Sequence, residues 1–447
     1  MPGLATHDNV ALNADEQLVR VIGPWGLWAT AVNGTIGAGI FVLPGLVAAI
    51  LGPSAIIAYL ICGLAVALVL TCFIEIGSFV RRSGGAVAYV EEAFGSLAGF
   101  LAWLLYSVGF TMFACAALGA VLMDTLAFGW PAIGHGATRI VALLVLFGGL
   151  AAVNIVGVRQ GLRLTVATTI AKLLPLFFVI AAGLVVMHWR ELRWSGWPSA
   201  AKLGEASLLL FFAFQGSEDA LTPSGEIRDP ARTVPRAMFA AMGTLICIYI
   251  AAQVVCQGTL GSGLAQQPTA PLAAVAGHAI GSAGRTLIMV GLSLSIFGVL
   301  AGRLLTTPRA FFLIAQNGTI PAALARVHPR FRTPYVAIVT VAVLMFLLSA
   351  WGGFQRLAVY SSVCMLCVYL AICLAALRLR YTRQKVPGAF RARGGPTVGI
   401  LGAAVIVWLL SHSTWAQMGA LAAAVVLAIA YYYARREFLS RRGTGIS

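Results

Sequence analysis

The first long apolar run of this chain is interrupted by glycines, and the interrupted stretch reads Gly34-Thr35-Ile36-Gly37-Ala38-Gly39-Ile40-Phe41. The run around it, about 21–51, is long enough to span a bilayer. Glycine costs roughly 1 kcal/mol relative to alanine inside a helix, so three glycines within six residues predict that the helix unwinds here. Unwound backbone at membrane depth is tolerated only where protein buries it or where it lines a cavity. We therefore predict a cavity in mid-membrane, where free amides and carbonyls hold a small polar solute.

The composition agrees with a polytopic membrane protein. The 447 residues are 60% hydrophobic and only 10% charged, and the mean hydropathy is +0.92, a balance that excludes a soluble globular domain. We predict an all-α fold with twelve transmembrane helices. Their approximate cores are 22–50, 55–80, 97–128, 138–157, 164–187, 206–226, 236–260, 286–312, 335–350, 355–377, 396–412 and 415–434. Residues 1–20 are polar and lack the apolar segment of a cleavable signal peptide, so we expect them to form a cytoplasmic tail.

The net charge of +16 reflects membrane topology rather than nucleic-acid binding. With the N-terminus inside, basic residues collect in the inner loops at 81–82, 159–163, 228–236, 326–332, 378–393 and 435–442. The outer loops carry few: Arg139, Arg190, Arg193, Lys202, Arg285 and Arg356. This asymmetry follows the positive-inside rule, and the inner excess suits contact with anionic lipid. We expect a cell (inner) membrane protein with both termini, including the 435–447 tail, in the cytoplasm.

A second irregular span lies near residue 215, where an apolar run meets Gln215-Gly216-Ser217-Glu218-Asp219. Ionisable residues at membrane depth are costly and therefore point to function. The alternative is that the span ends at Gln215 and the carboxylates belong to a loop. The two breaks fall in the first and sixth spans, as an inverted repeat of five plus five helices requires. We predict one transporter domain over 21–434, with repeats at about 21–190 and 205–380 and two extra helices at about 396–434.

Four motifs carry a family resemblance. The first is Gly37-Ala38-Gly39-Ile40-Phe41, and the second is Phe212-Ala213-Phe214-Gln215-Gly216-Ser217-Glu218 followed by the Gly225–Ala237 segment. The others are Ser83-Gly84-Gly85-Ala86 and the segment from Pro308-Arg309-Ala310 to Thr333-Pro334. The chain resembles an amino-acid permease of the amino acid–polyamine–organocation (APC) superfamily. The resemblance implies the leucine-transporter type fold, in which the broken spans one and six form the substrate site at the middle of the membrane.

The chemistry of an amino acid suits these breaks. Its carboxylate is stabilised by unpaired amides at a helix N-terminus, so the amides of Gly37, Ala38 and Gly39 are candidates. The resemblance implies that carbonyls of Ile36, Phe212 and Gln215 receive the ammonium, with Gly216 completing the site. Ala38 stands where the family has serine, which either weakens or reshapes carboxylate binding. The alternative is that the glycines serve close helix packing. The resemblance also implies aromatic gates at Phe212 and Phe297.

Four charged side chains in or near the spans need an explanation. Lys172 lies near the middle of the fifth span, and the resemblance implies that its ammonium replaces a sodium ion and bridges the first and eighth spans. Glu218 either relays a proton or holds the unwound segment by accepting backbone hydrogen bonds. Arg303 needs an acidic partner that the sequence does not identify, and Glu75 is either a buried acid or near the inner surface.

We therefore expect a secondary transporter that moves an amino acid by alternating access. It is sodium-independent and works by proton symport or by amino-acid exchange. The alternatives are a polyamine or other organic-amine transporter and, from other classes, a membrane-embedded enzyme or a non-transporting sensor. The six histidines are dispersed and no nucleotide-binding loop occurs, so we expect no metal, no cofactor and no catalytic residue. The expected partners are the amino-acid substrate, protons and the lipid bilayer. The sequence does not indicate the oligomeric state.

Overall fold

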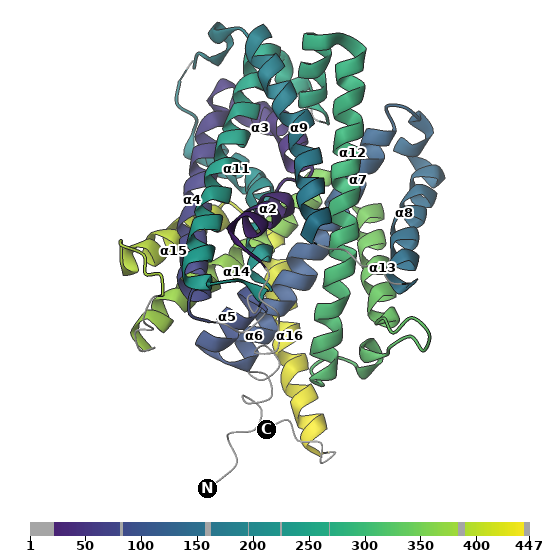
Figure 1. Cartoon of the computed structure of the whole chain (residues 1–447), viewed down its shortest axis with the longest axis vertical. Helices are drawn as coiled ribbons and strands as arrows, with labels where there is room; N and C mark the ends of the chain where they lie inside the picture. The colour runs from purple at the N-terminus through teal and green to yellow at the C-terminus, as the bar shows by residue number, and fades with distance from the viewer. Residues whose placement is uncertain are drawn as a thin grey trace.

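The computed structural model describes residues 22–80, 84–156, 162–194, 196–223, 226–267, 269–382 and 389–441. In these ranges the regular structure is helical, apart from one parallel β-bridge between Ile22 and Ile227. Figure 1 shows several long helices running side by side along the longest axis of the molecule. Within the same ranges, seven helices are long and apolar enough to cross a membrane. The chain is a helical, multi-pass membrane protein, whereas the count of twelve spans stays a prediction. The predicted tail at 1–20 lies outside the described residues.

The first half of the chain contains the first break. The helices are α2 (Pro24–Thr35), α3 (Gly39–Leu51), α4 (Ala55–Gly77), α5 (Gly85–Phe94), α6 (Ser96–Trp103), α7 (Thr111–Leu126), α8 (Gly136–Val156) and α9 (Leu162–Val186). Between α6 and α7, residues Leu104–Phe110 (η2) form a π-helical segment. The sequence predicted one continuous span over 97–128. A π segment inside a span widens the helix locally and is typical of functional sites.

The second half contains the second break. Its helices are α10 (Ala200–Leu210), the 3₁₀ turns η5 (Phe211–Phe214) and η6 (Ser217–Leu221), α11 (Pro230–Leu260), α12 (Pro271–Gln316), α13 (Tyr335–Trp351), α14 (Phe354–Thr382), α15 (Pro396–Ser411) and α16 (Trp415–Arg441). The predicted span at 286–312 is therefore part of a longer helix. That helix is not regular throughout, because Ile280 and Gly281 have non-helical backbone angles and mark a kink.

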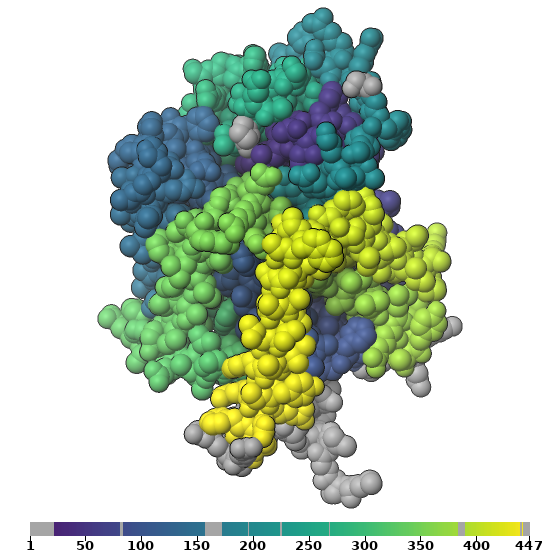
Figure 2. All heavy atoms as spheres, turned by 180° about the vertical axis from the view of Figure 1, so that it is seen from behind, coloured from purple at the N-terminus to yellow at the C-terminus, as the bar shows by residue number. Residues whose placement is uncertain are grey.

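The last helix, α16, lies on the outside of the bundle. It contacts α6 and α14, and Figure 2 shows it lying across the rear surface of the molecule. Only 6% of its most apolar stretch is buried by protein, and Val426 and Leu427 are 64% and 70% exposed. An apolar helix that protein does not cover is suited to contact with lipid tails.

The segments next to the two breaks meet beside the start of α5, a helix that Figure 1 shows in the lower half of the bundle. Ile22 donates its N–H to the Glu226 carbonyl at 3.0 Å, and Arg228 donates to the Ile22 carbonyl at 3.0 Å. Gly84, at the start of α5, donates to the Thr222 carbonyl at 3.1 Å. The chain entering α2 is therefore joined to the chain leaving η6. We call this end of the molecule the bridge end, after the Ile22–Ile227 bridge.

Candidate functional site

The first break separates α2 from α3. The helix α2 ends at Thr35, Ile36 takes extended angles (φ −73°, ψ 94°), and α3 begins at Gly39. The sequence predicted this unwinding from its glycines. Within the described residues, the amides of Gly37 and Ala38 donate to no backbone carbonyl. Both residues lie at the N-terminus of α3, where free N–H groups and the helix dipole favour an anion.

The second break lies at Gly216, which has a φ of +111°. Side chains other than glycine rarely adopt that angle. The Gly216 N–H donates to both carboxylate oxygens of Glu218 at 3.1 Å, and the Tyr369 hydroxyl donates to the same carboxylate at 2.7 Å. Glu218 is 2% exposed. Its carboxylate therefore holds the unwound backbone, which is one of the two roles that the sequence left open.

The two breaks are in direct contact. A Cβ atom built on Gly34 would lie 2.8 Å from the Gly216 carbonyl oxygen, and one built on Gly39 would lie 2.9 Å from the Cα of Ala213. The hydroxyl of Tyr249, from α11, lies 3.3 Å from the Thr35 carbonyl oxygen and 2.7 Å from that of Ala213. The glycines thus allow the two irregular segments to approach, and a buried tyrosine ties them together.

Lys172, on α9, lies against the first break. Its ammonium donates to the carbonyls of Asn33 and Ile36, at 3.1 Å each, and the residue is 8% exposed. Ile36 was expected to bind substrate through this carbonyl, which already accepts a hydrogen bond from Lys172. The helix α12, which contains the predicted eighth span, packs along α9. On α12, the Ser295 hydroxyl is buried and has no partner among the described residues.

Gln215 connects the sixth span to the third and tenth. Its side-chain amide nitrogen donates to the Ser362 hydroxyl at 3.1 Å, and its side-chain carbonyl oxygen lies 3.4 Å from the Ser361 hydroxyl. Ser361 also lies 3.2 Å from the carbonyl oxygen of Phe110, at the end of the π segment. All of these residues are buried. Polar groups of three spans therefore line the same region beside Gly216.

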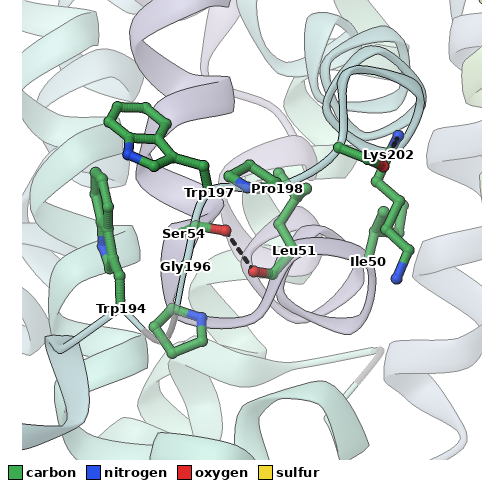
Figure 3. A pocket seen from close by; sticks show the side chains of 10 residues that line it. Ile50, Leu51, Ser54, Trp194, Gly196, Trp197, Pro198 and Lys202 are labelled. Atoms are coloured by element: carbon green, nitrogen blue, oxygen red, sulfur yellow. Dashed lines mark hydrogen bonds between the residues drawn. The ribbon is translucent and has the colours of Figure 1, made fainter.

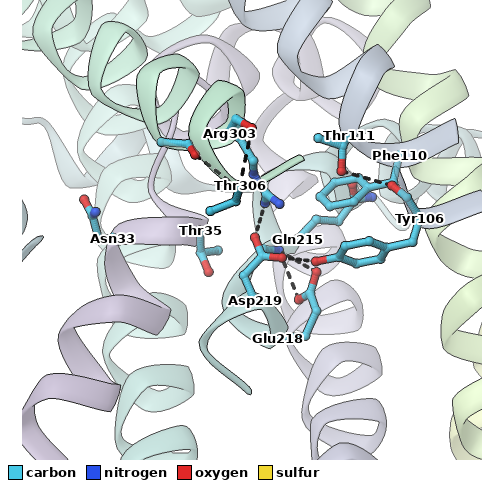
Figure 4. Close-up of polar contacts among 12 residues, drawn as sticks. Asn33, Thr35, Tyr106, Phe110, Thr111, Gln215, Glu218, Asp219, Arg303 and Thr306 are labelled. Atoms are coloured by element: carbon cyan, nitrogen blue, oxygen red, sulfur yellow. Dashed lines mark hydrogen bonds and ion pairs between the residues drawn. The ribbon is translucent and has the colours of Figure 1, made fainter. Parts of the chain in front are cut away.

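A charged cluster surrounds Asp219, which follows Gly216 by three residues, and Figure 4 shows its side chains. Arg303 of α12 pairs with the carboxylate of Asp219, and the Tyr106 hydroxyl of the π segment donates to the same carboxylate. The Arg303 guanidinium also lies over the Phe110 ring, 5.3 Å from its centroid, which is close enough for a cation–π contact. Asp219 is therefore the acidic partner of Arg303, which could not be identified from the sequence.

The two predicted gate residues differ in their surroundings. Phe212 is 9% exposed and meets Phe354 edge-on, with ring centroids 5.4 Å apart. Phe297 is 48% exposed and shares an exposed apolar stripe of α12 with Leu287, Val290 and Leu294. A stripe of that kind is suited to lipid. The structure thus brings Phe212 to the breaks and does not bring Phe297 there, so a gating role for Phe297 has no support in this arrangement.

Two further features lie away from the breaks. Glu75 is a buried acid: it accepts hydrogen bonds from Arg380 at 3.3 Å and from the Ala392 amide at 3.2 Å. A cavity of about 420 Å³ lies between the α3–α4 turn and the segment before α10, as Figure 3 shows. Trp194, Trp197 and Lys202 are among its lining residues. It includes none of the residues predicted to bind substrate.

Sequence reasoning missed three tyrosines that organise the site, namely Tyr106, Tyr249 and Tyr369. Each lies inside an apolar run of the sequence. A buried tyrosine hydroxyl usually finds a hydrogen-bond partner, so their positions were a usable signal. Their partners come from other spans and could not be deduced without the packing.

Paired broken helices inside a polytopic helical bundle point to the binding site of a transporter. Comparison with known proteins agrees: the family model described as amino acid permease matches residues 22–432. The chain belongs to the amino acid permease family of the APC superfamily. It is therefore an amino-acid transporter and not an enzyme.

Three relatives illustrate the range of the family. The chain is 31% identical to the serine/threonine exchanger SteT of Bacillus subtilis (strain 168), over 86% of this chain and 87% of the relative. It is 26% identical to the methylthioribose transporter of the same organism, over 96% of each. It is 25% identical to the branched-chain amino acid permease BcaP, also of that organism, over 91% and 90%.

Proposed function

We propose that this chain moves a neutral amino acid across the membrane by alternating access, with the substrate bound between the breaks at 36–39 and 212–216. The observation that carries the proposal is the contact between Gly34 and Gly216 beside the unpaired amides of Gly37 and Ala38. Those amides suit the substrate carboxylate. Carbonyls of Phe212 and Gln215 suit its ammonium, and Ile36 offers its remaining lone pair. Phe212 packs on Phe354 at the first residue of α14, and since the far end of α14 reaches α5, this contact closes the site on the side away from the bridge end.

Charge balance supports a neutral side chain. Asp219 is paired with Arg303, and the Glu218 carboxylate already accepts from Gly216 and Tyr369. A cationic substrate needs a free carboxylate and an anionic one needs a free cation, because unpaired charges are costly in a dry site. The named relatives include transporters of serine and threonine and of branched-chain amino acids, which are neutral. These facts also weigh against a polyamine substrate.

Lys172 supports a sodium-independent mechanism. Its ammonium donates to two carbonyls of the first break, which are the kind of oxygen ligand that a sodium ion would use. Because the Lys172 ammonium already occupies these carbonyls, the protein needs no sodium ion at that position. The unpartnered hydroxyl of Ser295 on α12 is the candidate for the contact with the eighth span. Whether the coupling is proton symport or exchange depends on whether Lys172 or Glu218 changes protonation during the cycle.

The proposed function is tested by flux in proteoliposomes. Purified protein is reconstituted, and uptake of labelled serine, leucine, lysine, glutamate and putrescine is measured with and without an internal amino acid. We expect uptake of at least one neutral amino acid. The same ligand should raise the thermal unfolding temperature of the purified protein, because a ligand that binds only the folded state stabilises it. Uptake of putrescine or lysine alone would contradict the neutral substrate.

The arginine asymmetry yields a separate prediction about orientation. Single cysteines placed at the 378–396 loop or at either terminus should be labelled from the cytoplasmic side, and one in the 188–205 loop from the outside, because basic loops stay inside. The measurement uses a maleimide that does not cross membranes, on intact cells and on inverted vesicles. Arg383 lies outside the described residues, and labelling of a cysteine next to it from the outside would reverse the proposed topology.

A further inference from the structure

We propose that Asp219, Arg303 and Tyr106 form an ion-pair gate that closes the transport path between the two breaks and the bridge end of the molecule. The proposal rests on the proposed transport function. The three side chains come from different parts of the bundle: Asp219 from η6, Arg303 from α12 and Tyr106 from the π segment η2. Both contacts converge on the single carboxylate of Asp219, as Figure 4 shows.

The position of the carboxylate fits a gate. In chain order Asp219 follows the break at Gly216, and the chain then continues to Thr222 and Ile227, which hold Gly84 and Ile22 at the bridge end. Asp219 therefore lies between the proposed substrate site and that end. Side-chain exposures of 14% for Arg303 and 24% for Asp219 show that protein closes most of the space around the pair.

The chemistry of the cluster fits a contact that forms and breaks. The carboxylate and the guanidinium neutralise each other, so the closed state leaves no unpaired charge in the membrane. The guanidinium also rests on the Phe110 ring at 5.3 Å, and this ring belongs to the π segment. π segments are rare in helices and occur frequently at functional sites. Movement of η6 away from α12 and η2 breaks both contacts together, which gives the path two discrete states.

The site is closed on its other side as well. Phe212 packs on Phe354, the first residue of α14, whereas the last turns of α14 reach α5 through Arg378 and Phe94. Because α5 begins at the bridge end, the Phe212–Phe354 contact lies on the opposite side of the breaks, and the structure has barriers on both sides. An alternating-access transporter passes through such a state between its two open forms. Weakening only the ion-pair gate should therefore favour the form that opens toward the bridge end.

The test measures from which face a reporter cysteine is reached. The reporter is Ser217→Cys, because Ser217 is 1% exposed and its hydroxyl has no partner in the described part of the chain. A maleimide that does not cross membranes is added to each face of the proteoliposomes in turn. The blank is the protein without the reporter, which accounts for the native cysteines. The gate variant is Asp219→Asn/Arg303→Gln, which removes both charges and leaves neither partner unpaired.

The matched control is Asp124→Asn/Arg139→Gln. This second ion pair joins α7 and α8 at 2.6 Å and lies outside the proposed path. We expect the gate variant to raise labelling from the bridge-end face by at least ~5-fold, the lower end of common coupling factors, and to lower it from the opposite face. The control pair should change neither rate. Tyr106→Phe, which removes only one hydroxyl, should shift labelling in the same direction by less.

Three outcomes decide the proposal. The proposal is overturned if the gate variant and the Ser217→Cys protein with the native ion pair are labelled equally at both faces. It is also overturned if the gate variant is labelled faster at the face opposite the bridge end. An equal rise in the control variant would show general loosening and would overturn it too. Flux separates the two proposals: a gate response without amino-acid uptake by the wild type supports the gate and contradicts the substrate, whereas normal uptake without a gate response does the reverse.

Discussion

Replacing Gly39 with leucine is expected to abolish amino-acid binding while leaving membrane insertion intact. Even the first atom of a side chain at Gly39 would lie 2.9 Å from both the Cα and the Cβ of Ala213, closer than a carbon contact allows. Overpacking of this kind costs about 1–3 kcal/mol. Since every 1.4 kcal/mol is about tenfold in an equilibrium constant, separating the two breaks should weaken binding roughly 10- to 100-fold before the rest of the leucine side chain is counted.

The chain supplies a matched control two residues earlier. A Cβ atom at Gly37 would lie 3.6 Å from the Leu118 Cδ2, an ordinary van der Waals contact, so Gly37→Ala should keep most of the affinity. The larger Gly37→Leu should lose binding, since its side chain enters the space next to the free amides. Affinity is measured by ligand-induced thermal shift or by isotope binding to purified protein. Wild-type affinity in Gly39→Leu would remove the breaks as the substrate site.

The sequence predicted those parts of the site that depend on local backbone chemistry. The glycines at 34–39 are costly within a helix, and the second break was expected where an apolar run meets the polar residues 215–219. Both breaks occur at those places. Glu218 and Lys172 stood out because charges are expensive in a membrane, and each is hydrogen-bonded to one of the breaks. Each of these inferences needed only the type of a residue and the apolar character of the sequence around it.

The parts that could not be predicted depend on how spans far apart in the chain pack together. Asp219 and Arg303 are 84 residues apart by their numbers, and no local pattern joins them. Tyr106 and Phe110 lie in a π segment, and nothing in the apolar sequence around them distinguishes that segment from a regular α-helix. Phe297 shows a limit of motif matching, which implied a position near the substrate, whereas the face of α12 that it occupies is exposed. The face of a helix is set by its neighbours as well as by its motif.

The second large effect is expected from Lys172→Ala, which should reduce amino-acid flux at least ~10-fold. The change removes the two hydrogen bonds to the carbonyls of Asn33 and Ile36, both 3.1 Å long. Breaking a buried, charge-assisted hydrogen bond costs about 1.5–3 kcal/mol, enough for a loss of this size. The chain has three lysines, and Lys202→Ala is the matched control because its side chain is exposed. That control should transport at the wild-type rate.

The same variant separates the possible coupling mechanisms. If the Lys172 ammonium stands in for a sodium ion, wild-type uptake should be unchanged when choline replaces sodium, because no site for the ion is left open. If Lys172 also gains and loses a proton in each cycle, uptake should depend on pH, and the remaining uptake of Lys172→Ala should lose that dependence. If the protein is instead an exchanger in which Lys172 stays charged, Lys172→Ala should lose flux, and its remaining uptake should keep the pH profile of the wild type. The assignment fails if sodium stimulates uptake by the wild type and Lys172→Ala transports normally, since the ammonium would then be neither a structural bridge nor a substitute for the ion.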